Sequence, residues 1–275
     1  MHWSYFLMIG IPLFLLVIYY GLPKFLNTLG LHPHYKIPHY NLTGQKALVI
    51  TTSHDTLGET GKKTGVFASE MTVPYYAFWD AGMKVDIASI KGGKVPVEPH
   101  SMGWPLATAD DYRFKRDAIA MEKLKTSLCI NDIDIADYDV VFLAGGWGAA
   151  YDFAQSDKLG ELISNAHSKG VLIGSVCHGA LGLVKATDSA GKPIVENRKI
   201  TGVTDQQISQ LGIEITPKHP ESELRKLGAN FEANTAFKDM FATHVAVDGI
   251  IFTGQNQNSG YETSHRILER LSSKR

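Results

Sequence analysis

A cysteine stands at the end of an apolar run in VLIGSVCHGALGLV, residues 171–184. Hydrophobic residues lead straight into Cys177, and small residues compatible with a helix follow it, which is typical of a nucleophile elbow. At a helix N-terminus the positive end of the dipole favours the thiolate over the thiol. We therefore predict that Cys177 is a nucleophile with His178 as its partner. A buried structural cysteine is the alternative.

Two glycines follow another apolar run, in the segment AGGWGA. Because Gly145 and Gly146 have no Cβ, their backbone can approach a reacting oxygen closely. We expect their amides, with that of His178, to form an oxyanion hole. Trp147 and Gly179 then lie beside it in the substrate site. A plain tight turn is the alternative for the double glycine.

The composition is that of an ordinary globular protein, with 44% hydrophobic and 20% charged residues among 275. A formal net charge of -1 gives no electrostatic basis for binding nucleic acid, so we exclude that class of partner. Cys129 and Cys177 are the only cysteines, too few for a disulfide framework. We therefore expect reduced thiols, as in the cytosol.

The first 26 residues contain no Asp, Glu, Lys or Arg before Lys24. Their apolar run of about 20 residues matches the bilayer core, so residues 1–26 predict a single transmembrane anchor. A cleaved signal peptide is the alternative, but the basic start and the A-x-A site are missing. Tyr19 and Tyr20 suit a membrane interface, and the lysines that follow favour a cytoplasmic domain. Residues 27–44 predict a linker or an ordered arm.

From Lys46 onward, strand-like and helix-like segments alternate with short connections. This order predicts a mainly parallel sheet covered by helices on both faces. A polar stretch at residues 105–135 predicts a helical insertion that roofs a pocket. The predicted strands are residues 46–53, 83–90, 138–146, 170–179, 199–203 and 244–254, and the predicted helices are residues 71–82, 156–169 and 263–275.

Five segments occur in an order that resembles the DJ-1/PfpI superfamily over roughly residues 46–272: GKKTGVFASE, AGMKVDIASIKGGKVPVEPHS, LAGGWGA, SVCHGALGL and VDGIIFTGQNQNS. The insertion, and the combination of Glu70 with Cys177 and His178, look most similar to the heat-shock protein 31 branch. The resemblance implies an α/β fold, a flavodoxin-like three-layer sandwich, for residues 45–275. The transmembrane helix precedes it.

In that family a glutamate from an early loop hydrogen-bonds the elbow cysteine, and the TGVFASE motif maps this role onto Glu70. Burial and a neighbouring thiolate would favour its protonated form, so it can also carry a proton. An acid at a helix start is the alternative. His178 resembles the catalytic-dyad histidine, and Asp205 its acidic partner or equally a helix N-cap. Trp147 replaces a histidine common in this branch, which alters the pocket.

The resemblance implies a glutathione-independent glyoxalase of the D-lactate dehydratase type, or a deglycase, that acts on methylglyoxal-like aldehydes through Cys177. It implies no metal and no organic cofactor, and a homodimer is one expected assembly. A stress chaperone or a redox sensor without turnover is the alternative. Amidotransferase chemistry is a third hypothesis, suggested by the tripeptide HPE at residues 219–221, although this tripeptide opens a helix-like stretch. His100, beside Glu98, can face the pocket or solvent.

Overall fold

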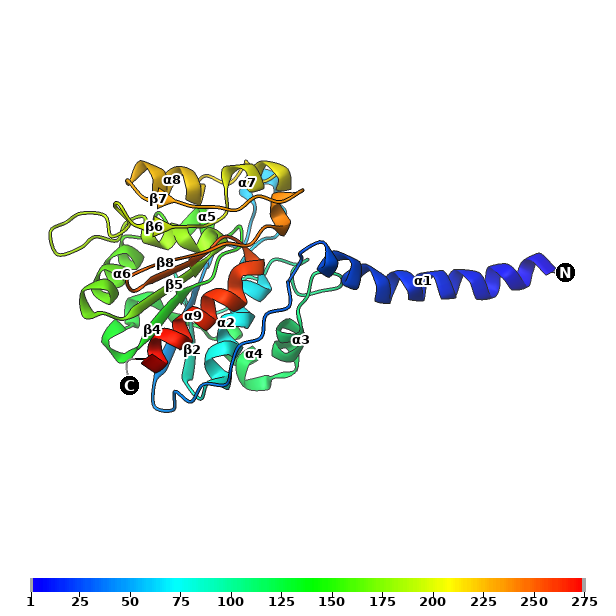
Figure 1. Ribbon diagram of the computed structural model, residues 1–275, viewed down its shortest axis with the longest axis horizontal. Helices are drawn as coiled ribbons and strands as arrows, with labels where there is room; N and C mark the ends of the chain where they lie inside the picture. Colours follow the sequence, from blue (N-terminus) through cyan, green and yellow to red (C-terminus); the bar gives the residue numbers. More distant parts are fainter. Residues whose placement is uncertain (1, 274–275) are drawn as a thin grey trace.

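The computed structural model describes residues 2–273, and its centre is a seven-stranded sheet (Figure 1). The strand order is β3-β2-β1-β4-β5-β9-β8, and all neighbours are parallel except β8 and β9. The central strands thus follow the doubly wound order of flavodoxin-like folds, as predicted. The strands are β1 (Lys46–Thr51), β2 (Lys84–Ser89), β3 (Leu128–Cys129), β4 (Val140–Leu143), β5 (Leu172–Val176), β8 (Val245–Asp248) and β9 (Ile251–Gly254).

Helices cover both faces of the sheet and complete the three layers (Figure 1). One face packs on α2 and α9, with α3 and α4 beside them, and the opposite face packs on α5, α6 and the 3-10 helix η4. Strands β4, β5 and β9 are buried at every residue because each face meets a helix layer. The helices are α2 (Ala68–Asp80), α3 (Ala109–Arg116), α4 (Ala118–Lys125), α5 (Ala149–Asp152), α6 (Asp157–Lys169), η4 (Cys177–Leu183) and α9 (Gly260–Ser273).

Smaller elements surround this core. The strands β6 (Lys199–Ile200) and β7 (Asn230–Phe231) form a separate parallel pair. The helices α7 (Asp205–Leu211) and α8 (Pro220–Lys226) lie in the same part of the chain. The remaining 3-10 turns of the described chain are η1 (Gly58–Thr60), η2 (Ile130–Asp132), η3 (Ile135–Asp137), η5 (Asp239–Phe241) and η6 (Gln257–Ser259).

Three predicted elements differ in the structure. Residues 244–254 form the antiparallel hairpin β8–β9, because the chain turns through Gly249, whose φ is +63°. Residues 199–203 contribute β6 to the small sheet and not to the large one. The insertion at residues 105–135 contains α3 and α4, which pack against α2 and β2. The two helices do not line the pocket described below, but Leu106 at the start of the insertion does.

The helix α1 (His2–Thr28) projects away from the domain (Figure 1). Its segment Ile11–Thr28 is long and apolar enough to cross a membrane, with a mean hydropathy of 1.3, and none of it is buried. The whole helix has 27 residues and is about 40 Å long at 1.5 Å per residue. This length exceeds the roughly 30 Å of a bilayer core.

The segment after α1 lies against the domain as an ordered arm. Leu42 is fully buried, and its amide donates a hydrogen bond of 2.7 Å to the carbonyl of Ala81. The hydroxyl of Tyr35 lies 2.6 Å from Nδ1 of His265 in α9. Leu31 is only 4% exposed. The arm therefore joins the end of α1 to the body of the domain without a free stretch between Leu31 and Leu42.

Candidate active site

Cys177 lies at a sharp turn between β5 and η4, at the carboxyl end of a central strand. Its φ is +58°, a left-handed conformation that costs a non-glycine residue about 1–2 kcal/mol. Gly179 permits the turn, since a Cβ there would lie 2.1 Å from the carbonyl oxygen of Leu143. This strained backbone holds the thiol at the sheet edge, which is the geometry of a nucleophile elbow.

His178 is fully buried beside the thiol. Its Nδ1 lies 3.5 Å from Sγ of Cys177, and its Nε2 has no hydrogen-bond partner among residues 2–273. Burial, with a smaller contribution from the charge of His219, lowers the pKa of His178 to about 3. The imidazole is therefore neutral at physiological pH. It can accept a proton only transiently.

Glu70 is in the first turn of α2 and is 1% exposed. A Cβ on Gly145 would lie 2.5 Å from its Oε2 atom, so the missing side chain makes room for the carboxyl group. Burial raises the pKa of Glu70 to about 8, although the thiol of Cys177 and the amides of Gly145 and Gly146 partly oppose the rise. Glu70 is therefore protonated at neutral pH, and it faces the sulfur in addition to starting a helix.

The position of Cys177 at a helix start predicts a thiolate, but its surroundings in the structure favour the neutral thiol. Burial raises the pKa of Cys177, and the negative charge of an ionised Glu70 raises it further. The backbone amides of His178 and Gly146 lower it, but their effect is smaller than that of burial. Desolvation therefore outweighs the helix terminus. The thiolate forms only when the Cys177–Glu70 pair as a whole gives up a proton.

The amides of Gly146 and His178 both point to the region of the sulfur, since both stabilise its negative charge. Gly146 has a φ of +97°, and a Cβ there would lie 2.3 Å from the amide nitrogen of Phe67. Only glycine fits this close approach of two chain segments. The two amides are therefore placed to hold an oxyanion that develops next to Sγ.

These groups open into a cavity of about 220 Å³. Glu70, Cys177 and His178 are among the residues that line it. Apolar side chains from many parts of the chain form most of its wall: Leu31, Phe67, Leu106, Trp147, Val203, Leu211 and Met240. The remaining lining is polar or glycine: Glu98, His100, Gly146, Gln207, Asn256 and Gln257. Within residues 2–273 no three His, Cys, Asp or Glu residues are grouped so that they could hold a metal ion.

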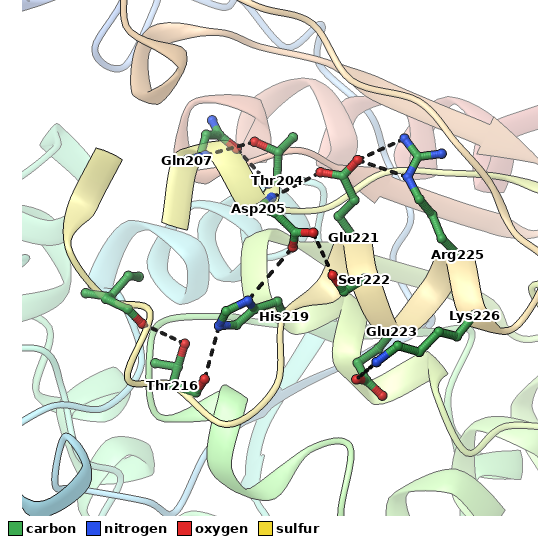
Figure 2. Close-up of polar contacts among 11 residues, drawn as sticks. Thr204, Asp205, Gln207, Thr216, His219, Glu221, Ser222, Glu223, Arg225 and Lys226 are labelled. Carbon is green, nitrogen blue, oxygen red and sulfur yellow. Dashed lines mark hydrogen bonds and ion pairs between the residues drawn. The ribbon is translucent and has the colours of Figure 1, made fainter. Parts of the chain in front are cut away.

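Asp205 is the predicted site residue that the structure places differently. It is the first residue of α7, whose N-cap is Thr204 and not Asp205. Its Oδ2 accepts a hydrogen bond of 2.6 Å from Ser222, and its Oδ1 lies 3.9 Å from Nδ1 of His219 (Figure 2). The expected hydrogen bond from His178 to Asp205 is not formed, because Nε2 of His178 is unpartnered and Nδ1 faces the sulfur.

The tripeptide at residues 219–221 lies in the same polar network (Figure 2). His219 precedes α8, and its Nε2 lies 3.0 Å from the carbonyl oxygen of Thr216. Glu221 accepts hydrogen bonds from the amide of Asp205 and from Arg225. The tripeptide thus starts a helix, as its sequence suggested, and its polar partners do not include Cys177.

Sequence reasoning assigned no role to several residues that line the cavity. Glu98 is 5% exposed, and burial raises the pKa of its carboxyl group. Asn256 and Gln257 follow β9 at the carboxyl edge of the sheet, a position that by itself suggests a ligand site. Leu31 comes from the arm, which has no periodicity that could have indicated it. His100, for which the sequence predicted a place facing the pocket or solvent, lines the cavity and is also exposed.

Known proteins resemble this chain in sequence. A model of the DJ-1/PfpI family matches residues 63–270. The chain is 28% identical over 232 residues to the glutathione-independent glyoxalase HSP31 of Saccharomyces cerevisiae, a match that covers 82% of this chain and 96% of the relative. It is also 28% identical over 229 residues to glyoxalase 3 of Candida albicans, covering 80% and 95%.

Solved structures agree with the sequence relatives. The Rapid Encystment Protein of 24 kDa from Francisella tularensis superimposes with a TM-score of 0.77 at 29% identity, over 82% of this chain and 99% of that one. Glyoxalase III from Candida albicans superimposes with a TM-score of 0.74 at 26% identity, over 82% and 96%. The chain belongs to the DJ-1/PfpI family, with relatives of the HSP31-like glyoxalase III type.

Proposed function

We propose that this protein is a cysteine-dependent, glutathione-independent glyoxalase that converts methylglyoxal to lactate. The observation that carries the proposal is the left-handed Cys177, whose thiol shares a buried site with Glu70 and His178. The similarity to proteins named glutathione-independent glyoxalases supports it. A cavity of about 220 Å³ around the thiol also favours turnover of a small molecule over binding of unfolded chains.

In the first step, Sγ of Cys177 adds to the aldehyde carbon of methylglyoxal. The thiol gives up its proton before the attack, and the new C–S bond forms as the C=O double bond gives its electron pair to the aldehyde oxygen. That oxygen then takes the proton of Glu70, which leaves Glu70 as the carboxylate base of the second step. The product is a hemithioacetal. The amides of Gly146 and His178 stabilise the negative charge on the oxygen before it is protonated.

In the second step, a base removes the hydrogen of the former aldehyde carbon, and an enediol forms with the neighbouring ketone. A proton returned to that neighbouring carbon gives a thioester of lactate. Water then hydrolyses the thioester, which releases lactate and restores the thiol. One substrate carbon is oxidised and the other is reduced, so no external oxidant is needed.

Glu70 is better suited than His178 to hold the moving proton. The pKa of Glu70 is about 8 and that of His178 about 3. A proton is therefore held far more readily by the Glu70 carboxylate than by the His178 imidazole, because burial raises the pKa of Glu70 and lowers that of His178. We therefore assign the proton transfers to Glu70, with neutral His178 orienting the sulfur and its adduct.

The direct test is lactate formation from methylglyoxal by the purified full-length protein, without glutathione, with the Cys177→Ala variant as the control. We expect glutathione-independent production of one lactate per methylglyoxal by the wild type and none above background by the variant. Equal production by both proteins would show that the elbow cysteine does not perform the reaction.

We also propose that α1 anchors the protein in a membrane and that the domain lies on the cytoplasmic side. Support comes from the exposed apolar side chains of Ile11–Thr28 and from the lysines that follow them. The full-length protein should stay with membranes in carbonate at high pH, whereas deletion of residues 1–30 should release a soluble and active domain. Extraction of the full-length protein by carbonate alone would contradict an integral anchor.

A further inference from the structure

The cavity is larger and more apolar than methylglyoxal requires. Its volume of about 220 Å³ corresponds to roughly seven water-sized groups at about 30 Å³ each, and methylglyoxal has five non-hydrogen atoms. Seven of the lining side chains are large and apolar. A small, strongly hydrated dicarbonyl gains little from such a wall.

Two parts of the apolar wall are joined directly to the base of α1. Leu31 follows the end of the helix by three residues. The neighbouring His32 reaches the loop that carries Leu106, since its Nε2 lies 2.8 Å from the carbonyl oxygen of Leu106. In that same loop, Trp104 donates a hydrogen bond of 2.9 Å from Nε1 to the carbonyl of Tyr19. The pocket wall and the apolar helix are therefore one connected structure.

Exposed apolar side chains also occur on the lining of the cavity and in the chain segments next to it. Leu211, a lining residue, is 39% exposed. Trp104 is 40% exposed and stacks on Tyr19 of α1, with ring centroids 5.7 Å apart. Phe237 is 78% exposed and stacks on Phe241, which in turn contacts the arm at Gly30. Exposed aromatic groups beside an apolar helix are typical of a membrane interface.

On the basis of the proposed glyoxalase activity, we propose that the preferred substrates are amphiphilic 2-oxoaldehydes. The dicarbonyl head reaches Cys177, and the apolar chain lies along Leu31 and Leu106 toward the base of α1. The chain replaces water against the apolar wall, which supplies binding energy that methylglyoxal cannot supply. The chemistry at the sulfur is that of methylglyoxal, and the product is a 2-hydroxy acid with the same chain.

The test compares straight-chain 2-oxoaldehydes of three, six and nine carbons with the full-length protein in phosphatidylcholine vesicles. Each methylene that becomes buried should raise kcat/KM about three- to fourfold, until the chain fills the cavity. We expect the nine-carbon substrate to exceed methylglyoxal by about tenfold, because the cavity has room for about two methylenes beyond the methylglyoxal head. If kcat/KM is flat or falls with chain length while methylglyoxal is turned over, the substrate class is wrong and the glyoxalase activity stands.

Variants at the wall make the test specific. Leu211→Asn and Leu106→Asn should each lower the ratio of nine-carbon to three-carbon kcat/KM at least fivefold. Leu211 is exposed, so its variant carries little risk to folding. Ile119→Asn is the matched control, because Ile119 is 61% exposed on α4 and outside the cavity. Equal ratios in the wild type and both wall variants would overturn the proposed path of the chain.

A second readout does not depend on turnover. In a Cys129→Ala background, N-hexyl iodoacetamide should alkylate Cys177 at least tenfold faster than iodoacetamide. If no 2-oxoaldehyde is turned over but the hexyl reagent reacts faster, the glyoxalase proposal fails and the apolar chain site stands. If there is no turnover and no faster alkylation, both the glyoxalase proposal and the apolar chain site fail. The nine-carbon substrate can be loaded into the vesicles or added in solution. Faster turnover of the loaded substrate would show that the protein takes its substrate from the bilayer, and equal rates would show that it takes it from solution.

Discussion

Replacing Glu70 by glutamine tests where the proton of the buried pair resides. Glutamine keeps the size of the side chain and one donor, but it cannot exchange a proton. The wild-type carboxyl has a pKa of about 8, so it is protonated at neutral pH and can donate to the thiolate. The amide is a weaker donor to a charged sulfur, by roughly 1.5 kcal/mol on the scale of hydrogen bonds to charged groups. This difference corresponds to a rise of about one unit in the thiol pKa.

Two measurements follow from the Glu70→Gln change. Methylglyoxal turnover should fall by a factor of about 10² to 10⁴, the range of a positioned general acid or base. The pH midpoint of iodoacetamide alkylation at Cys177, measured in a Cys129→Ala background, should rise by about one unit. Below the midpoint the variant should therefore be alkylated about tenfold more slowly. Glu98→Gln is the comparator, because Glu98 lines the same cavity, but its carboxyl is not among the groups that shift the pKa of Cys177.

The direction of the midpoint shift separates two arrangements of charge. If Glu70 is ionised in the reactive state, its negative charge opposes the thiolate, and neutralising it should lower the midpoint. The wild-type activity should rise with pH toward about 8, as the pair loses its first proton. A lower midpoint in the variant would refute the protonated carboxyl. An unchanged midpoint together with unchanged turnover would show that Glu70 serves only as an acid at a helix start.

Three further substitutions test the elbow and its surroundings. Cys177→Ala should bring turnover to background, while the free energy of unfolding measured by urea changes by about 1 kcal/mol or less. Gly179→Ala should lower the free energy of unfolding by about 2 kcal/mol, because its Cβ would lie 2.1 Å from the Leu143 carbonyl oxygen; a wild-type urea midpoint would contradict the tight turn. Asp205→Asn should change kcat/KM less than threefold, since the side chain of Asp205 contacts Ser222 and His219. A hundredfold loss of kcat/KM would instead support Asp205 as the acidic partner of His178.

The order of elements was predictable because each one depends on local patterns. Buried apolar runs predicted β1, β4 and β5, and an amphipathic pattern predicted α6, all within a few residues of their bounds. The elbow was predictable for the same reason: the strand, Cys177 and the small residues after it are contiguous. Residues 244–254 were misread as one strand, because a turn through a single Gly249 leaves a weak signal between two apolar runs.

The sequence by itself placed Cys177, His178 and the double glycine at one sheet edge, because parallel strands bring their carboxyl ends together and the elbow motif is local. Glu70 was assigned to the same site through the family resemblance. Only the tertiary structure decided how these groups behave. Burial by distant segments, and not the helix terminus, controls the pKa of Cys177, and it also makes Glu70 a neutral acid. The tertiary structure also decided the surroundings of Asp205, whose side chain contacts Ser222, 17 residues away in the sequence. Desolvation and long-range contacts depend on the whole fold, so no local pattern contains them.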